Sequence, residues 1–287
     1  MNVLGIHALV WVDAWSEEEA RRAIRRTREA GYDLLEIPLL DPYVVDAAMT
    51  RRLLEQAGIA ASCSLGLPFD ADVSSADPAV AARGEAFLER AIQVTAALGA
   101  SFLGGVVHSA MGKHLEPPTE LGRSRCVEAL RRLAERAERR GVTIGVEAVN
   151  RYESNLVNTA DQALALVDQI GASNLVVHLD TYHMNIEEAD LAGPLHRCGG
   201  RLGYVHVGES NRGYLGRGSV DFGTFFHALA DIGYAGPIVF ESFSSVVVSP
   251  AFASALAIWR DPWRDGLDVA RSARAFIDAQ LREAAPA

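Results

Sequence analysis

Residues 175–188 read Leu175-Val-Val-His-Leu-Asp-Thr-Tyr-His-Met-Asn-Ile-Glu-Glu188, so that an apolar run changes abruptly into a polar one. The apolar part predicts a buried strand that ends at Asp180, with His183 in the connection that follows. An Asp and a His placed where a buried strand ends are free to converge on a ligand. Three acidic residues further on indicate the first turn of a helix, where negative charge is favoured: Glu187, Glu188 and Asp190.

The same unit, a short apolar run and then a helical pattern, recurs along the chain. Apolar runs typical of strands covered on both faces lie at eight places: 3–9, 33–37, 59–65, 101–107, 142–147, 175–179, 202–207 and 237–241. Helical patterns separate them, and two open with a capping box, at Ser16–Glu19 and Thr159–Gln162. Residues 242–265 are expected to form a long loop. The repeat of roughly 30 to 35 residues matches a βαβ unit, which predicts an α/β fold, a single-domain (β/α)8 TIM barrel over residues 1–287.

Composition excludes several classes of protein. Of the 287 residues, 49% are hydrophobic and 22% charged, and the formal net charge is −10. With no basic footprint, neither nucleic acid nor an anionic membrane is an expected partner. No apolar run reaches the roughly 18 residues of a membrane span, and the first residues predict a strand rather than a signal peptide. Three scattered cysteines are too few for a disulfide framework, so we expect a cytoplasmic protein.

The lysine content excludes one kind of chemistry. Lys113 is the only lysine, and it lies in a Gly-Lys-His segment that is not predicted to be buried. An aldolase that works through a Schiff base needs a desolvated lysine. No Gly-rich phosphate loop of the GxxxxGK[ST] type occurs either.

The ends of four consecutive strands carry side chains that bind metals. Active sites of such barrels lie at the carboxyl ends of the strands, where the sequence places Glu147, Asp180, His206 and Glu241. Crowded carboxylates repel one another unless a cation joins them. Three carboxylates and one imidazole suit Mn²⁺ or Co²⁺, with Mg²⁺ as a further candidate. Glu36 also ends a strand, across the barrel, and there an internal salt bridge is expected.

Other polar residues in the following loops are candidates for binding a polyol: Glu153, His183, Glu209 and Arg212. An ion pair within the loops explains Arg151 and Glu209 equally well. His178 faces the barrel interior, where a hydrogen-bonded core histidine is expected. Trp15 follows the first strand, and its ring would either stack on a sugar face or pack beneath its loop.

Several segments resemble the signature segments of one family, the ketose 3-epimerases. This group contains D-tagatose, D-allulose (psicose) and L-ribulose 3-epimerases, within the xylose-isomerase-like TIM barrels. The segments that carry the resemblance are Gly145–Glu153, Leu179–Glu188, Val205–Gly213, Val239–Phe243, Ser64–Pro68, Val73–Pro78 and Ile258–Trp263. The resemblance covers nearly the whole chain. It is specific for the family and much less so for the sugar.

The resemblance implies a role for each matching residue. Glu147, Asp180, His206 and Glu241 match the ligands of one divalent metal ion per subunit, Mn²⁺ foremost. Glu147 and Glu241 also match the two acid/base carboxylates. The family further implies a small-molecule ketose as substrate and a homodimer or homotetramer as the assembly.

The resemblance also implies how the ketose is held. Positions near O1 and O2 of the sugar match Glu153, His183 and Arg212. Candidates for the wall that faces the far end of the sugar are His7, Trp15, Cys63, Ser64, His108 and Met111.

The expected reaction interconverts free ketoses at C3: D-fructose with D-allulose, D-tagatose with D-sorbose, and L-ribulose with L-xylulose. A metal polarises the carbonyl and stabilises a cis-enediolate, while one carboxylate removes the C3 proton and another returns one to the opposite face. The alternative is an aldose–ketose isomerase of the hydroxypyruvate- or xylose-isomerase type. A metal-dependent phosphoesterase or endonuclease would need more histidines and a basic groove. A non-catalytic sugar-binding protein would not need the ligand set.

Overall fold

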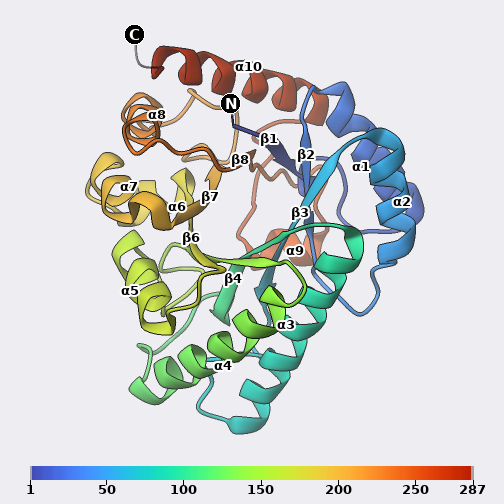
Figure 1. The fold of residues 1–287 in the computed structure, drawn as a ribbon. Coiled ribbons are helices and arrows are strands. Elements are labelled where there is room, and N and C mark those ends of the chain that lie inside the picture. The colour runs from blue at the N-terminus through green and yellow to red at the C-terminus, as the bar shows by residue number, and fades with distance from the viewer. Residues whose placement is uncertain (1, 286–287) are drawn as a thin grey trace.

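A closed ring of parallel strands lies at the centre of the computed structural model, which describes residues 2–285 (Figure 1). Within these residues the eight strands pair in chain order, and the last returns to the first. The strands are β1 Leu4–His7, β2 Leu34–Pro38, β3 Ala60–Leu67, β4 Phe102–Ala110, β5 Thr143–Ala148, β6 Leu175–Asp180, β7 Leu202–Val207 and β8 Ile238–Phe240. Every neighbouring pair is parallel. The predicted TIM barrel is therefore confirmed.

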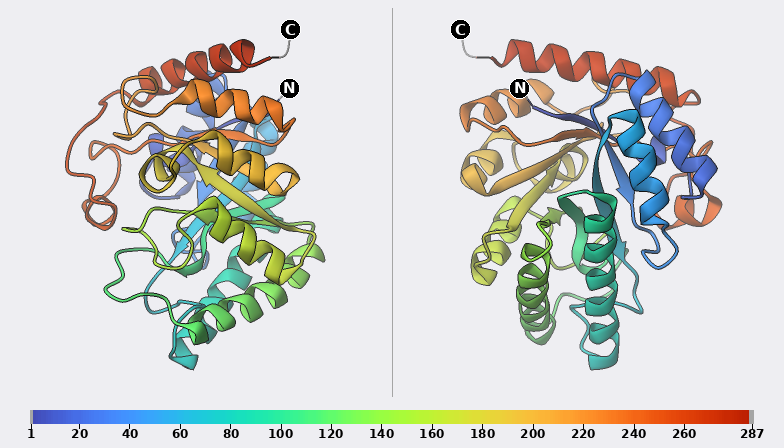
Figure 2. Two further views of the ribbon diagram at one scale, coloured as in Figure 1. Left: turned by 90° about the vertical axis from the view of Figure 1, so that its left-hand side faces the viewer. Right: turned by 45° about the vertical axis from the view of Figure 1, so that its right-hand side comes forward.

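Helices cover the outer face of this ring, as the two views of Figure 2 show. The α-helices are α1 Glu17–Glu29, α2 Ala47–Ala57, α3 Pro78–Leu98, α4 Glu120–Glu138, α5 Ala160–Ile170, α6 Thr181–Glu187, α7 Ala192–Cys198, α8 Phe222–Asp231, α9 Pro250–Ala255 and α10 Gly266–Glu283. Two 3-10 turns are η1 Ala8–Val10 and η2 Gly199–Arg201. Consecutive outer helices pack on one another, and α10 lies beside α8 and β8. None of the helices described is long and apolar enough to cross a membrane.

Local signals in the sequence account for the ends of several helices. Both predicted capping boxes are present: Ser16 and Thr159 each accept a hydrogen bond from the backbone of the third helical residue, whose side chain bonds back. Gly99 ends α3 with a positive φ of 82°, a conformation that a residue without a Cβ adopts at little cost. These contacts involve neighbours in sequence, so the sequence alone could place them.

Two regions differ from the prediction. The helix expected to start near Glu187 is replaced by α6, which starts at Thr181 and ends at Glu187, and by α7, which starts at Ala192. Asp180 accepts the N–H of Tyr182 and so caps α6 directly, which places His183 in a helix instead of a loop. The expected long loop after β8 contains α9, which Ser249 caps and Pro250 opens.

Side chains fill the barrel, so the site rests on a packed floor. The rings of Phe102 and Tyr204 stack inside it, with centroids 4.0 Å apart. At the opposite end, α9 covers the mouth with its own small cluster, in which Phe252 packs against Leu9 and Phe243. The space between floor and cover is where the strand-end residues meet.

Candidate active site

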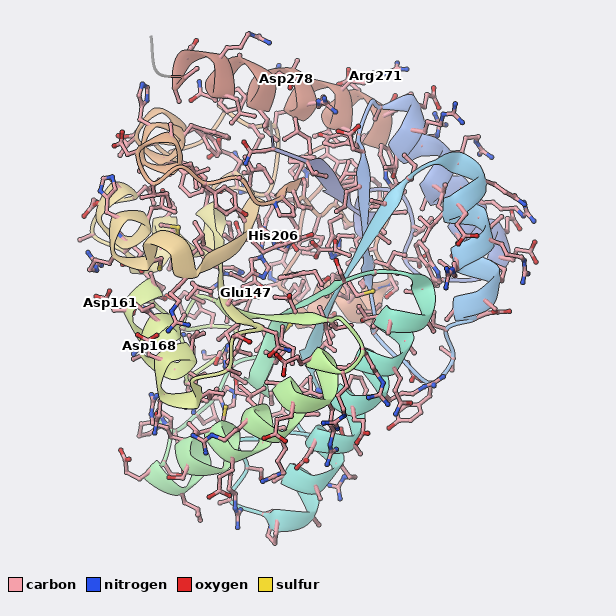
Figure 3. All side chains as sticks on the ribbon, in the orientation of Figure 1. Glu147, Asp161, Asp168, His206, Arg271 and Asp278 are labelled. Atoms are coloured by element: carbon pink, nitrogen blue, oxygen red, sulfur yellow. The ribbon has the colours of Figure 1, made fainter. Side chains whose placement is uncertain are left out.

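Adjacent strands present the four candidate ligands at one end of the barrel. Glu147 lies on β5, Asp180 ends β6, His206 lies on β7, and Glu241 directly follows β8. Asp180 and His206 are partners in the register of β6 and β7. Figure 3 shows Glu147 and His206 inside the ring, whereas Asp161 and Asp168 lie on the outer helix α5. The barrel therefore holds Glu147 and His206 in its interior, away from the acidic residues of the outer helices.

The imidazole of His206 lies between two of the carboxylates. Its Nδ1 is 3.4 Å from Oε1 of Glu147 and 3.7 Å from Oε1 of Glu241. Asp180, His206 and Glu241 bring one ligand atom each within 4.8 Å of the others, and Glu147 belongs to two similar groups, one with His206 and one with Asp180. Nδ1 of His206 is buried and has no hydrogen-bond partner. Carboxylates and an unpartnered imidazole nitrogen at these separations fit a divalent cation.

A buried polar chain on the barrel floor orients His206 from behind. Oε2 of Glu36 accepts hydrogen bonds from Nε2 of His206 at 2.8 Å and from the hydroxyl of Tyr204 at 2.6 Å. Tyr204 also contacts Ser62 at 2.6 Å. Because Nε2 donates to a carboxylate, the neutral ring keeps its lone pair on Nδ1, the atom that faces the site. The expected salt bridge of Glu36 is therefore a contact to the candidate ligand His206.

The two carboxylates proposed for proton transfer have opposite pKa shifts. Burial, despite the neighbouring His206, raises the pKa of Glu147 to about 7. Burial also favours the protonated form of Glu241, but Arg212, His206 and His7 hold its pKa below the ordinary value. Near neutral pH the metal-free site therefore holds one carboxyl that readily carries a proton and one that is ionised, an arrangement suited to acid/base work.

Arg212 provides the positive charge in this site. Its Nη1 is 3.1 Å from Oδ2 of Asp180 and 2.6 Å from Oε2 of Glu241. The guanidinium carbon stands 3.7 Å from the ring centroid of Tyr182 and 4.9 Å from that of Phe243. This position between two aromatic rings restricts the guanidinium to the carboxylate side of the cleft.

Comparison with known proteins places this geometry in a family. The family model described as "Xylose isomerase-like TIM barrel" matches residues 24–273. A ketose 3-epimerase of Arthrobacter globiformis is 50% identical over 278 residues, which cover 97% of this chain and 96% of that protein. An L-ribulose 3-epimerase of Methylomonas sp. (strain DH-1) is 49% identical over 95% of this chain and 96% of its own length. The chain belongs to the ketose 3-epimerase family.

A solved structure from the same family shares the fold nearly throughout. The D-allulose 3-epimerase from Methylomonas sp., in complex with D-allulose, has a TM-score of 0.96 and 48% sequence identity, and the match covers 97% of each chain. The present protein is thus an isomerase, a carbohydrate epimerase that acts at C3 of ketoses.

The epimerase has a cleft beside the four residues, and Glu147, His206 and Glu241 are among the side chains that line it. Five of the predicted substrate residues line it: His7, Ser64, Glu153, His183 and Arg212. Its other wall is apolar and includes Leu9, Leu40, Val106, Met111, Phe252 and Leu256. One side of the cleft is therefore charged, and the other side can make only apolar contacts with a ligand.

Asn150, which the sequence analysis did not single out, orients two of these residues. Its backbone N–H donates to Nδ1 of His183 at 3.1 Å, and its side-chain Nδ2 donates to Oε1 of Glu153 at 2.9 Å. His183 therefore carries its proton on Nε2, which lies 3.7 Å from Oδ2 of Asp180. Burial lowers the pKa of His183 to about 3, so the ring stays neutral. Only its position three residues after Glu147 could have suggested Asn150.

Three residues expected at the cleft wall do not line it: Trp15, His108 and Cys63, the last of which is completely buried. His108 is fully buried, and its Nε2 contacts the carbonyl of Glu147 at 3.0 Å. Trp15 borders a neighbouring cavity and donates from Nε1 to Oγ1 of Thr50 at 3.0 Å. His108 therefore bonds the backbone of β5 instead of lining the cleft, and Trp15 packs beneath its loop, which is one of the two positions expected for it.

Of the two loop residues for which an ion pair was expected, Arg151 forms one and Glu209 is bonded by backbone groups. Arg151 forms an ion pair with Glu187 at 2.8 Å, at the end of α6. The carboxylate of Glu209 is completely buried and is bonded by backbone N–H groups of its own loop. Neither residue lines the cleft, so neither is placed to bind the sugar directly.

Proposed function

We propose that this epimerase is metal-dependent and interconverts free ketoses at C3: D-fructose with D-allulose, D-tagatose with D-sorbose, and L-ribulose with L-xylulose. The observation that carries the proposal is the set of Glu147, Asp180, His206 and Glu241, with an unpartnered Nδ1 at its centre, on one side of a cleft that His7, Ser64, Glu153, His183 and Arg212 also line. These four residues would hold one divalent cation per subunit, Mn²⁺ in preference to Co²⁺ or Mg²⁺.

A bound cation would supply electrophilic polarisation of the ketose carbonyl, which acidifies the proton at C3. Residues of this chain would carry out the proton transfers at C3. Glu147 lies on β5 and Glu241 follows β8, and their Oε1 atoms lie 3.4 Å and 3.7 Å from His206 Nδ1; a ketose carbon bound between these two carboxylates would meet one on each face. One removes the C3 proton and the other returns a proton from the opposite side, with the roles exchanged in the reverse reaction.

Neutral and charged groups around the cleft would orient the sugar. His183 Nε2–H, the Arg212 guanidinium and the Glu153 carboxyl can bond oxygens near C1 and C2, and His7 and Ser64, 3.3 Å apart, face the same space. Arg212 is the only lysine or arginine among the described cleft residues, and two carboxylates already neutralise it. Free ketoses therefore fit better than phosphorylated ones.

NMR of each ketose with enzyme and Mn²⁺ in D₂O, with the metal removed before acquisition, tests the function. We expect deuterium at C3 together with the C3 epimer: D-allulose from D-fructose, D-sorbose from D-tagatose, and L-xylulose from L-ribulose. Deuterium at C1 or C2 with an aldose product would instead establish the isomerase alternative. No exchange in any of these sugars, with metal shown to be bound, would refute the proposed substrate class.

A homodimer or homotetramer in the cytoplasm is the setting we propose. Apolar side chains such as Phe69, Leu115 and Tyr152 are exposed beside the loops after β3, β4 and β5, where a second subunit would cover them. Cys63, Cys126 and Cys198 are buried free thiols, which suits a reducing compartment. Light scattering on the purified protein would show the assembly, and a monomer at micromolar concentration would count against it.

Glu36→Gln should weaken metal binding although Glu36 is not one of the four proposed ligands. A glutamine carbonyl can accept the same two hydrogen bonds, from His206 Nε2–H and the Tyr204 hydroxyl, but it carries no negative charge, so it holds the imidazole less firmly and makes its Nδ1 a weaker ligand. We expect Mn²⁺ affinity to fall roughly 10- to 100-fold in titration calorimetry. Glu85→Gln, which removes a surface carboxylate 2.7 Å from Arg132, serves as the matched control. Unchanged affinity in Glu36→Gln would show that the buried chain does not support the metal.

A further inference from the structure

The loop after β7, residues 208–220, folds around one buried carboxylate. Glu209 is fully buried, and its Oε1 accepts hydrogen bonds from the N–H of Ser210 at 2.8 Å and of Val220 at 3.3 Å, and from the hydroxyl of Ser210 at 3.0 Å. Its Oε2 accepts one from the N–H of Gly216 at 2.9 Å. The carboxylate thus joins the beginning, the middle and the end of the loop.

The loop closes so tightly on this carboxylate that one position needs glycine. A Cβ at Gly218 would lie 2.2 Å from Oε1 of Glu209 and 2.4 Å from Oγ of Ser210. An ionised carboxylate accepts all four hydrogen bonds, whereas an amide would turn a donor toward at least one backbone N–H. The path of the whole loop therefore depends on an acidic residue at position 209.

The same loop holds Arg212 in an unusual backbone conformation. Arg212 has a φ of 57°, which a residue with a Cβ seldom adopts without support. Its N–H donates to the carbonyl of Glu209 at 2.8 Å, and its own carbonyl accepts the hydroxyl of Ser242. Trp263 holds that hydroxyl in turn, from Nε1 at 2.6 Å. Glu209 thus supports the backbone of Arg212 from within the loop, and Ser242 supports it from the segment after β8.

We propose that Glu209 is the positioning residue of Arg212. It lies outside the cleft and acts by fixing the backbone from which the guanidinium reaches Asp180 and Glu241 between the rings of Tyr182 and Phe243. In this way it sets the charge beside one proposed acid/base carboxylate. The expected effect on epimerisation kinetics rests on the proposed function, whereas the expected effect on the position of Arg212 does not.

A double-mutant cycle with Arg212 separates positioning from general support of the fold. We expect Glu209→Gln to lower kcat/KM for C3 epimerisation about tenfold, the usual scale for a hydrogen bond to a charged group. In the Arg212→Ala background the same change should alter kcat/KM by less than about twofold. An equal loss in both backgrounds would overturn the proposal, because Glu209 would then act independently of Arg212.

A second readout does not depend on turnover. The guanidinium bonds two carboxylates that would also hold the cation, so removing or releasing it should free their oxygens. In titration calorimetry we expect Arg212→Ala and Glu209→Gln both to bind Mn²⁺ more tightly than wild type, by about three- to tenfold, and the double variant to match Arg212→Ala. Weaker or unchanged Mn²⁺ binding in Glu209→Gln would contradict the inference. If the wild type exchanges no proton at C3, the proposed function fails while this measurement still decides the role of Glu209.

Two further variants control for folding. Asp221→Asn changes an exposed carboxylate that also accepts a backbone N–H and a hydroxyl, both from Thr224, just outside the loop. It should keep wild-type kcat/KM and Mn²⁺ affinity, and a loss equal to that of Glu209→Gln would refute a specific role. If circular dichroism shows Glu209→Gln unfolded, Gly218→Ala replaces it, since the added Cβ presses on the same carboxylate and should give the same coupling to Arg212.

Discussion

Glu147→Gln and Glu241→Gln will each lower the rate of epimerisation by about 10²- to 10⁴-fold at saturating Mn²⁺. Each removes one of the two groups that can carry the C3 proton, and a glutamine cannot take its place because an amide does not titrate. Epimerisation needs proton removal on one face and return on the other, so the loss of either group stops the net reaction. Initial rates of D-fructose or L-ribulose conversion, with metal content checked by elemental analysis, measure the effect.

Isotope exchange tests the assignment more strictly than rate alone. The carboxylate that remains in each variant still faces the C3 proton of one epimer, so it should exchange that proton with D₂O and return it to the same face. We therefore expect Glu147→Gln to exchange C3 of one member of an epimer pair and Glu241→Gln to exchange C3 of the other. Glu85→Gln should behave as wild type. Exchange of the same epimer by both variants, or near-normal turnover by either, would show that these glutamates are not the two proton carriers.

Much of the barrel could be predicted because its signals are local. The capping boxes at Ser16 and Thr159 join residues three positions apart, and the apolar runs that fill both faces of parallel strands need no partner to be recognised. The prediction for the connection after β6 was wrong because one residue has two roles there. Asp180 caps α6 while also facing the site, so the helix starts directly at the end of the strand. The acids that follow serve other purposes: Glu187 pairs with Arg151, and Asp190 accepts a hydrogen bond from the backbone of Ala192.

The convergence of the candidate ligands was also predictable, because strands of one closed barrel end at one rim. What the sequence could not show is which residue orients which. Glu36 and His206 are separated by 170 positions and meet only across the barrel floor. Glu209 stood among the possible sugar contacts, and its actual partners are backbone groups that no side-chain pattern reveals. His108 has the right residue type on a strand, yet its ring is buried against the carbonyl of Glu147 and does not line the cleft.

Removing the metal should abolish turnover and also loosen the protein. Chelation leaves Glu147, Asp180 and Glu241 crowded around His206, so the cation that offset their repulsion is lost. We expect no measurable epimerisation after dialysis against a chelator, full recovery on addition of Mn²⁺, and a melting temperature lower by roughly 5 to 10 °C for a site that had been saturated about 1,000-fold. Full turnover by protein in which no metal is detected would refute metal dependence outright.

The pH dependence of rebinding follows from the same groups. In the metal-free protein burial raises the pKa of Glu147 to about 7. Although burial opposes it, the carboxylates of Glu36, Glu241 and Glu147 raise the pKa of His206 well above its usual value. Both groups must lose a proton before they bind a cation, so the apparent affinity for Mn²⁺ should fall as pH drops through the raised pKa of His206 and, below about 7, through that of Glu147 as well, by about tenfold per pH unit for each proton displaced. Titration calorimetry in buffers of different ionisation enthalpy will count those protons. Binding that neither releases protons nor weakens at low pH would mean that Glu147 and His206 are not ligands.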